Sequence, residues 1–174
     1  RWYRQMVGIS SPGDTTVVSN KWMLGTRNSF IIGISATFLA TALGTVAALG
    51  LSRPNMPFKG VLMAILISPM IVPLIITSAG MFFFYSKIGL THTYLGLILA
   101  HTALGTPFVV ITVTATLTGF DTNLIRASQS LGANTIRTFF KVIMPLILPG
   151  VISGGLFAFI TSFDEVVVVM FVGS

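Results

Sequence analysis

The chain has 174 residues, of which 53% are hydrophobic and only 8% are charged, whereas a soluble domain carries about 25% charged residues. This composition predicts an all-α, polytopic membrane protein, and the absence of cysteine excludes disulfides, thiol catalysis and Cys-type zinc sites. The net charge of +6 comes from basic residues scattered singly between apolar runs, which argues against a nucleic-acid-binding surface.

The first segment, residues 1–27, is polar and contains a strong turn signal at residues 10–14, with the sequence SSPGD. Its tryptophans and tyrosine are amphipathic aromatics of the kind enriched at membrane interfaces. We therefore expect residues 1–27 to be an external loop segment near the lipid headgroups, and residues 28–174 to form the transmembrane domain. Both chain ends are abrupt and look cut.

Two membrane spans are predicted in the first half of the chain. The segment from Ser29 to Leu51 has no charged residue, and about 20 apolar residues suffice to cross a bilayer. A second span is predicted from Gly60 to Phe84, with Pro69 and Pro73 inside it. Each of these prolines removes a backbone hydrogen bond, so we expect a kink or local unwinding near mid-membrane. The kink either serves helix packing alone or lines a substrate path.

A third span is predicted from Tyr94 to Thr116, and it contains His101. A lone histidine in a span either hydrogen-bonds a neighbouring helix or lines a path through the protein. Neither His92 nor His101 has a metal-binding partner at ligand spacing, so no metal site is expected.

The stretch between the third and fourth spans is amphipathic and predicts two short helices joined by a sharp turn. Asp121 is a good N-cap for the first helix and Asn134 for the second. Gly132 lies between them, and glycine readily adopts the positive φ that ends a helix. Most amphipathic helices beside a membrane only lie on its surface, and periodicity alone does not exclude this.

The fourth span is predicted from Val142 to Phe163, and it runs directly into Asp164 and Glu165. A charged residue at the centre of a membrane helix costs about 2.5–3.5 kcal/mol. The pair therefore either lies solvated at the membrane interface or supplies a counter-charge to a cationic substrate, through one or both carboxylates. In the second case, Asp164→Asn is expected to weaken uptake of di- or polyamines.

The spacing of residues in the amphipathic stretch resembles the EAA loop of ABC importer permeases. Here Arg126-Ala127-Ser128 is followed by three residues, Gly132, nine residues, Val142, one residue and Met144-Pro145. The family pattern is Glu-Ala-Ala, three residues, Gly, nine residues, Ile, one residue and Leu-Pro. The likeness extends from about Trp22 onward and is greatest to spermidine/putrescine-type permease subunits. Arg126 departs from the pattern, because it stands where the family usually has the glutamate.

The resemblance implies a type I importer permease of the cell inner membrane, of which this chain supplies the middle four of six spans. It also implies that residues 119–141 form a cytoplasmic coupling loop. The implied partners are a cytoplasmic ABC ATPase dimer, a second permease subunit, an external solute-binding protein and the lipid bilayer. The residues it assigns to ATPase coupling are Arg126, Ala127, Ser128, Leu131, Gly132, Ala133 and Pro145, and the substrate path is expected at Asp164 and Glu165.

The chain is not expected to be an enzyme or to need a cofactor, because it has no Gly-x-x-x-x-Gly-Lys-Ser/Thr run for ATP and no catalytic constellation. Polyamines are the expected substrates. The alternatives are a permease for an amino acid, a metal ion or an oxyanion, or a passive channel or scaffold. Basic residues are equally frequent on both predicted sides of the membrane, so the cytoplasmic position of the loop follows from the resemblance and not from charge.

Overall fold

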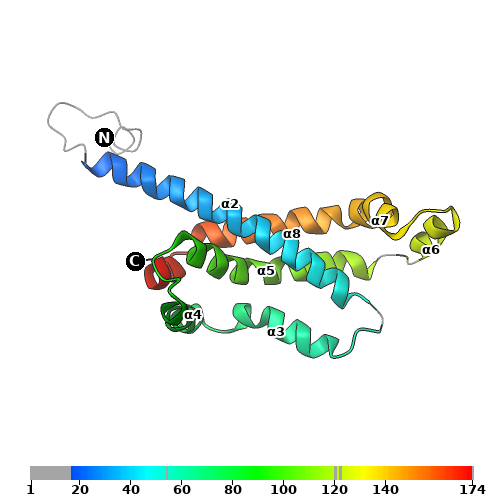
Figure 1. Cartoon of the computed structure of the whole chain (residues 1–174), viewed down its shortest axis with the longest axis horizontal. Coiled ribbons are helices and arrows are strands. Elements are labelled where there is room, and N and C mark those ends of the chain that lie inside the picture. Colours follow the sequence, from blue (N-terminus) through cyan, green and yellow to red (C-terminus); the bar gives the residue numbers. More distant parts are fainter. Residues whose placement is uncertain (1–16, 54, 120, 122, 174) are drawn as a thin grey trace.

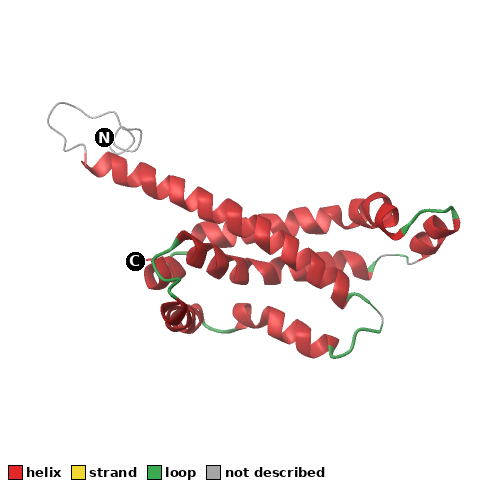
Figure 2. Cartoon of the chain, viewed as in Figure 1, coloured by secondary structure: helices red, strands yellow, loops and turns green. Residues whose placement is uncertain are grey.

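The structure is a computed structural model and describes residues 17–53, 55–119, 121 and 123–173. All the regular elements in these ranges are helices (Figure 2). Three long helices form an elongated bundle, α2 (Val17–Leu51), α5 (Tyr94–Thr118) and α8 (Met144–Asp164), and they lie side by side (Figure 1).

The core of the bundle is built on α5, which packs against both α2 and α8. Val109, Val110 and Val113 of α5 have no exposed surface, and neither has Ile147 of α8. β-Branched side chains are stiff, so they fill this core without much loss of rotamer freedom.

Small residues allow the three helices to approach closely. A Cβ atom added to Gly154 of α8 would lie 2.7 Å from the Cα atom of Val109. One added to Gly44 of α2 would lie 2.7 Å from the Cβ atom of the same valine. Membrane helices gain their packing energy from such backbone-to-side-chain contacts, because lipid supplies no hydrophobic driving force between helices.

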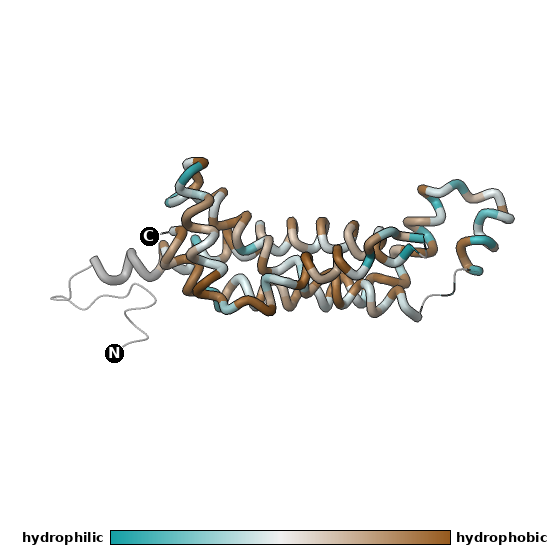
Figure 3. Tube along the Cα trace, turned by 90° about the horizontal axis from the view of Figure 1, so that it is seen from below, coloured by the Kyte–Doolittle hydropathy of each residue, from teal (hydrophilic) through white to brown (hydrophobic). Residues whose placement is uncertain are grey.

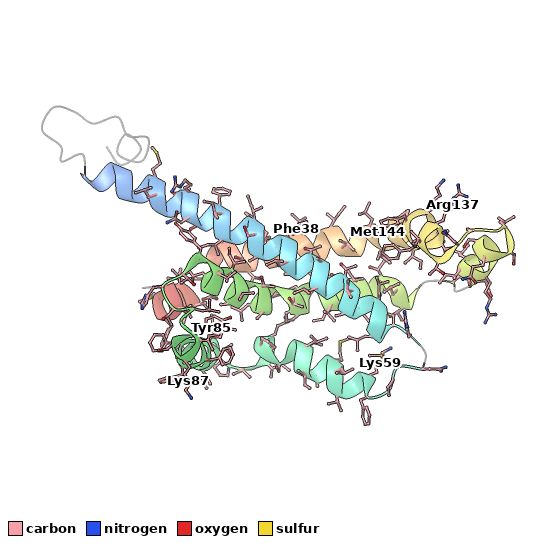
Figure 4. The ribbon with its side chains drawn as sticks, in the orientation of Figure 1. Phe38, Lys59, Tyr85, Lys87, Arg137 and Met144 are labelled. Carbon is pink, nitrogen blue, oxygen red and sulfur yellow. The ribbon has the colours of Figure 1, made fainter. Side chains whose placement is uncertain are left out.

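The outer surface of the bundle suits lipid. Phe38 points away from the other helices (Figure 4) and is 75% exposed. Hydrophobic residues run along the middle of the bundle, while hydrophilic ones gather in α6, α7 and the connecting turns (Figure 3). Three stretches are long and apolar enough to cross a membrane, at Met23–Leu51, Tyr94–Thr118 and Thr135–Asp164, and a bent helix pair supplies a fourth candidate. The predicted all-α polytopic fold is confirmed.

The predicted second span is sharply broken at the prolines where the sequence predicts a kink or local unwinding. It consists of α3 (Lys59–Ile71) and α4 (Leu74–Ile88), which are bent by 104°. Pro73 cannot donate a hydrogen bond to the carbonyl of Pro69, so the helix ends between them. In Figure 1, α3 runs along the bundle and α4 is seen end-on, across the end of the bundle opposite α6 and α7.

The first helix begins earlier than the sequence predicts. Helix α2 starts at Val17, so residues 17–27, which were expected to belong to a loop, are helical and extend the first span. The backbone of a helix continues past the end of an apolar run wherever its own hydrogen bonds are satisfied, so hydropathy does not fix its first residue. The turn predicted at residues 10–14 lies outside the described residues.

Candidate functional site

A helical elbow stands at one end of the bundle (Figure 1), formed by α6 (Asn123–Ser130) and α7 (Thr135–Thr138). The Oδ1 atom of Asp121 accepts a hydrogen bond of 2.9 Å from the amide of Asn123. The Oδ1 atom of Asn134 accepts one of 2.8 Å from the amide of Arg137. Gly132 has φ of +81°, which is strained for any residue with a side chain. The predicted turn and both predicted caps are confirmed.

On the inner side of the elbow, two hydroxyl groups form a hydrogen bond that joins α6 to α7. The Oγ atom of Ser128 lies 2.7 Å from Oγ1 of Thr138, and Thr138 is only 2% exposed. The amide of Ala133 donates to the carbonyl oxygen of Ser128 at 3.1 Å. Ser128 therefore holds the two short helices together and leaves the outer surface to other residues.

The outside of the elbow is apolar and exposed. Leu131 is 88% exposed, Ile136 69% and Phe140 63%. Ile136 and Phe140 also line a shallow groove with Gly132, Asn134, Arg137 and Lys141. Among the residues that the sequence analysis assigned to coupling, Arg126 and Ala127 are exposed on α6 and Ala133 is half-buried.

Pro145 is separated from the turn of the elbow. It lies in the first turn of α8, after a π-helix, η1 (Phe139–Ile143), in which the amide of Met144 donates to the carbonyl of Phe139. A proline ring clashes with the carbonyl four residues earlier, and the wider π-turn relieves this clash. The elbow therefore passes into α8 without a break.

The two predicted carboxylates lie near the C-terminal end of α8, away from the elbow, and their surroundings differ. Asp164 is exposed, whereas Glu165 is half-buried and its Oε1 atom accepts a hydrogen bond of 3.0 Å from the amide of Val168. Glu165 lines a cavity of about 430 Å³ bounded by α2, α5, the end of α8 and η2 (Val169–Gly173). A site of this volume is large enough for a small organic ligand.

Glu165 also lines a second cavity, at the break between α3 and α4. This cavity is bounded by Pro69 to Leu74, by Leu104 and Phe108 of α5, and by Thr161 of α8. No lysine or arginine is among the described residues that line either cavity. The carboxylate is therefore the strongest charge facing both spaces, and it gives them a negative potential.

His101 lines the first cavity and also ties α5 to α8. Its Nδ1 atom lies 2.8 Å from the Oγ atom of Ser162, so it bonds a neighbouring helix as the sequence allows, and it also faces a cavity. Sequence reasoning missed Ser162 and Asn28, which line the same cavity. Each is a polar residue in or beside an apolar run, and that was the only available signal.

The sequence of this chain is similar to those of a known protein family. Residues 40–174 match the model of the family described as binding-protein-dependent transport system inner membrane component. The chain belongs to this family. It is accordingly a multi-pass protein of the inner membrane, in agreement with its apolar helices.

Individual relatives carry more specific names. The chain is 34% identical over 145 residues to the spermidine/putrescine transport system permease protein PotC of Haemophilus influenzae, which covers 83% of this chain and 56% of that protein. It is 30% identical over 171 residues to PotC of Escherichia coli, covering 95% and 65%. The sulfoquinovosyl glycerol transport system permease protein SmoH of Agrobacterium fabrum is 28% identical over 138 residues, covering 79% and 48%. The chain thus spans between about half and two thirds of these relatives.

Proposed function

We propose that this chain is part of a permease subunit of an ATP-driven importer, and that its substrates are polyamines or similar small organic cations. ATP hydrolysis belongs to a separate ATPase subunit, because the sequence has no phosphate-binding loop. An external solute-binding protein is the partner that the family description suggests, and a second permease subunit is the partner that the resemblance of the loop implies.

The observation that carries the cationic substrate is the position of Glu165. Its carboxylate faces two cavities whose described lining has no basic residue other than histidine. A cation that leaves water for such a site replaces lost hydration with a charge-assisted hydrogen bond. An oxyanion would be repelled by the same carboxylate. The relatives include permeases named for other solutes, so the charge of the site is an independent argument for a cation.

Two further features support a substrate path beside Glu165. The break between α3 and α4 lies against this residue, and irregular backbone at membrane depth is tolerated mainly where it lines a cavity. Phe163 also lines the first cavity and packs against Phe30, with ring centroids 5.2 Å apart. An aromatic face is attractive to an ammonium group.

The elbow supports the coupling role. Leu131, Ile136 and Phe140 are exposed on a surface that also carries Arg137 and Lys141. Apolar side chains with a basic rim are typical of a protein-binding surface. We assign this surface to the ATPase, with Leu131 as the principal apolar contact and Arg126 at the edge.

The test is uptake by the complete transporter in proteoliposomes, with its partner subunits and binding protein. Linear di- and polyamines, a neutral amino acid and an oxyanion are offered in turn, with and without ATP. We expect ATP-dependent uptake of the amines and none of the oxyanion. Uptake of amines that does not need ATP would favour the passive channel, and ATP-dependent uptake restricted to another solute would refute the cationic substrate.

A further inference from the structure

A histidine that lines the cavity beside Glu165 has a buried ring nitrogen without a partner among the described residues. His101 is 2% exposed, and its Nδ1 atom is occupied by Ser162. Its Nε2 atom is buried and makes no hydrogen bond within the part of the chain that the structure describes. Leaving a buried polar atom unpaired costs about 1–3 kcal/mol. Such an atom in a residue that lines a cavity indicates a ligand that completes its bonding.

A second unpaired polar atom comes from another helix. The Oδ1 atom of Asn28 in α2 is buried and also has no partner among the described residues. Asn28 lines the same cavity as His101 and Glu165. Three elements therefore each supply one polar side chain to one space, at the end of the bundle away from the elbow (Figure 1).

The pair formed by His101 and Ser162 allows the Nε2 atom to accept a hydrogen bond. When Nδ1 carries the proton, it donates to the Oγ atom of Ser162, and Nε2 keeps a lone pair that can accept a hydrogen bond. In this tautomer the residues that line the cavity carry three acceptors: an imidazole nitrogen, an amide oxygen and a carboxylate.

We propose that His101, Asn28 and Glu165 together bind one primary ammonium end of the substrate. An ammonium group has three N–H donors and a positive charge, which matches three acceptors of which one is anionic. A hydroxyl group has one donor, so a polyol satisfies this set poorly. The inference rests on the proposed transport of organic cations and extends it by naming the residues that recognise the amine.

Two substitutions of His101 separate ligand binding from helix packing. His101→Asn keeps a polar group near the position of Nδ1, within reach of Ser162, and removes Nε2. His101→Gln places an amide near the position of Nε2. In the complete transporter with a radiolabelled linear diamine, we expect His101→Asn to raise KM about tenfold, the effect of losing one charge-assisted hydrogen bond. We expect the His101→Asn transporter to keep the maximal rate of the wild type. The His101→Gln transporter should have a KM within about threefold of the wild-type value.

Two more variants provide a second measurement and a control. Asn28→Ala is expected to raise KM in the same direction as His101→Asn. Thr37→Val removes another buried hydroxyl of α2, which has no partner in the described part of the chain, from a residue that is not among those lining this cavity, and KM should not change. An unchanged KM in both His101→Asn and Asn28→Ala overturns the proposal. An equal rise in Ser162→Ala and His101→Asn, without rescue by His101→Gln, also overturns it, because the histidine then acts only through packing.

The outcome also separates this inference from the proposed function. If the wild-type transporter takes up no diamine, the cationic substrate is wrong and the ammonium site fails with it. If the wild type takes up diamine and Glu165→Gln impairs uptake, whereas the His101 and Asn28 variants keep the wild-type KM, the ammonium site alone is wrong.

Discussion

Asp164 and Glu165 are adjacent and chemically similar, yet they have different surroundings. The sequence identifies the pair by composition, because two of the four acidic residues in the chain occur here. It does not decide which carboxylate faces a cavity. That depends on where α8 ends: Asp164 is its last residue, and Glu165, in an extended conformation with ψ of 105°, turns its side chain toward Val168 and the two cavities.

We therefore expect the two neutral substitutions to differ. Glu165→Gln should lower the uptake of a polyamine at low substrate concentration by about tenfold or more, because a charge-assisted hydrogen bond contributes about 1.5–3 kcal/mol. Asp164→Asn, which was the variant that the sequence suggested, should have a smaller effect because its carboxylate is exposed. The measurement is initial uptake by the complete transporter. A larger loss of uptake in Asp164→Asn than in Glu165→Gln would indicate that Asp164 supplies the counter-charge.

At the scale of elements, the fold depends on close contact between α5 and α8. Gly154→Val places methyl groups against the backbone of Val109, which lies 2.7 Å from the position of an added Cβ atom. Overpacking of this kind costs about 1–3 kcal/mol, so the purified protein in detergent should unfold at a lower temperature. The matched control is Gly80→Ala in α4, because nothing lies within 4 Å of its added Cβ atom and alanine is the better helix former. Equal melting temperatures for Gly154→Val and the wild type would contradict the packing of these helices.

The break between α3 and α4 gives a second prediction at this scale. Spin labels at positions 61 and 84, both exposed, would lie about 35 Å apart on one straight helix that rises about 1.5 Å per residue. With a bend of 104°, the same rise places them roughly 20 Å apart. The sequence has no cysteine, so two engineered cysteines can be labelled without background, and pulsed electron resonance measures the distance. A value near 35 Å would show a continuous span.

Some features of these elements were predictable from the sequence and others were not. The caps at Asp121 and Asn134 and the turn at Gly132 were predictable because each depends on a few neighbouring residues. The prolines at 69 and 73 located the break in the second span, but a missing hydrogen bond does not determine the angle, which is set by packing. The contact between His101 and Ser162 joins residues 61 positions apart, and no local pattern contains it.

At the scale of the whole molecule, the elbow lies at one end of the bundle and the C-terminal end of α8 at the other (Figure 1), and the residues at that other end line the cavity beside Glu165. Helix α8 joins them directly: its first turn follows η1 without a break, and Glu165 is its C-cap. Its 21 residues span about 30 Å, the thickness of the hydrocarbon core. We therefore expect a tilt of the elbow to move the cavity through α8, and α5 to move with it because Gly150 and Gly154 pack against it.

This arrangement predicts that the geometry of the elbow sets the coupling of the transporter. Gly132→Val forces a β-branched residue into a conformation with φ of +81°, which costs an L-residue roughly 1–2 kcal/mol or more, and should distort the turn that presents Leu131. We expect the complete transporter to hydrolyse several-fold more ATP for each substrate molecule taken up. Gly119→Ala is the matched control, because Gly119 has φ of −86° and alanine adopts that conformation freely. A Gly132→Val transporter with the wild-type ratio of uptake to hydrolysis would show that the elbow does not transmit the motion of the ATPase.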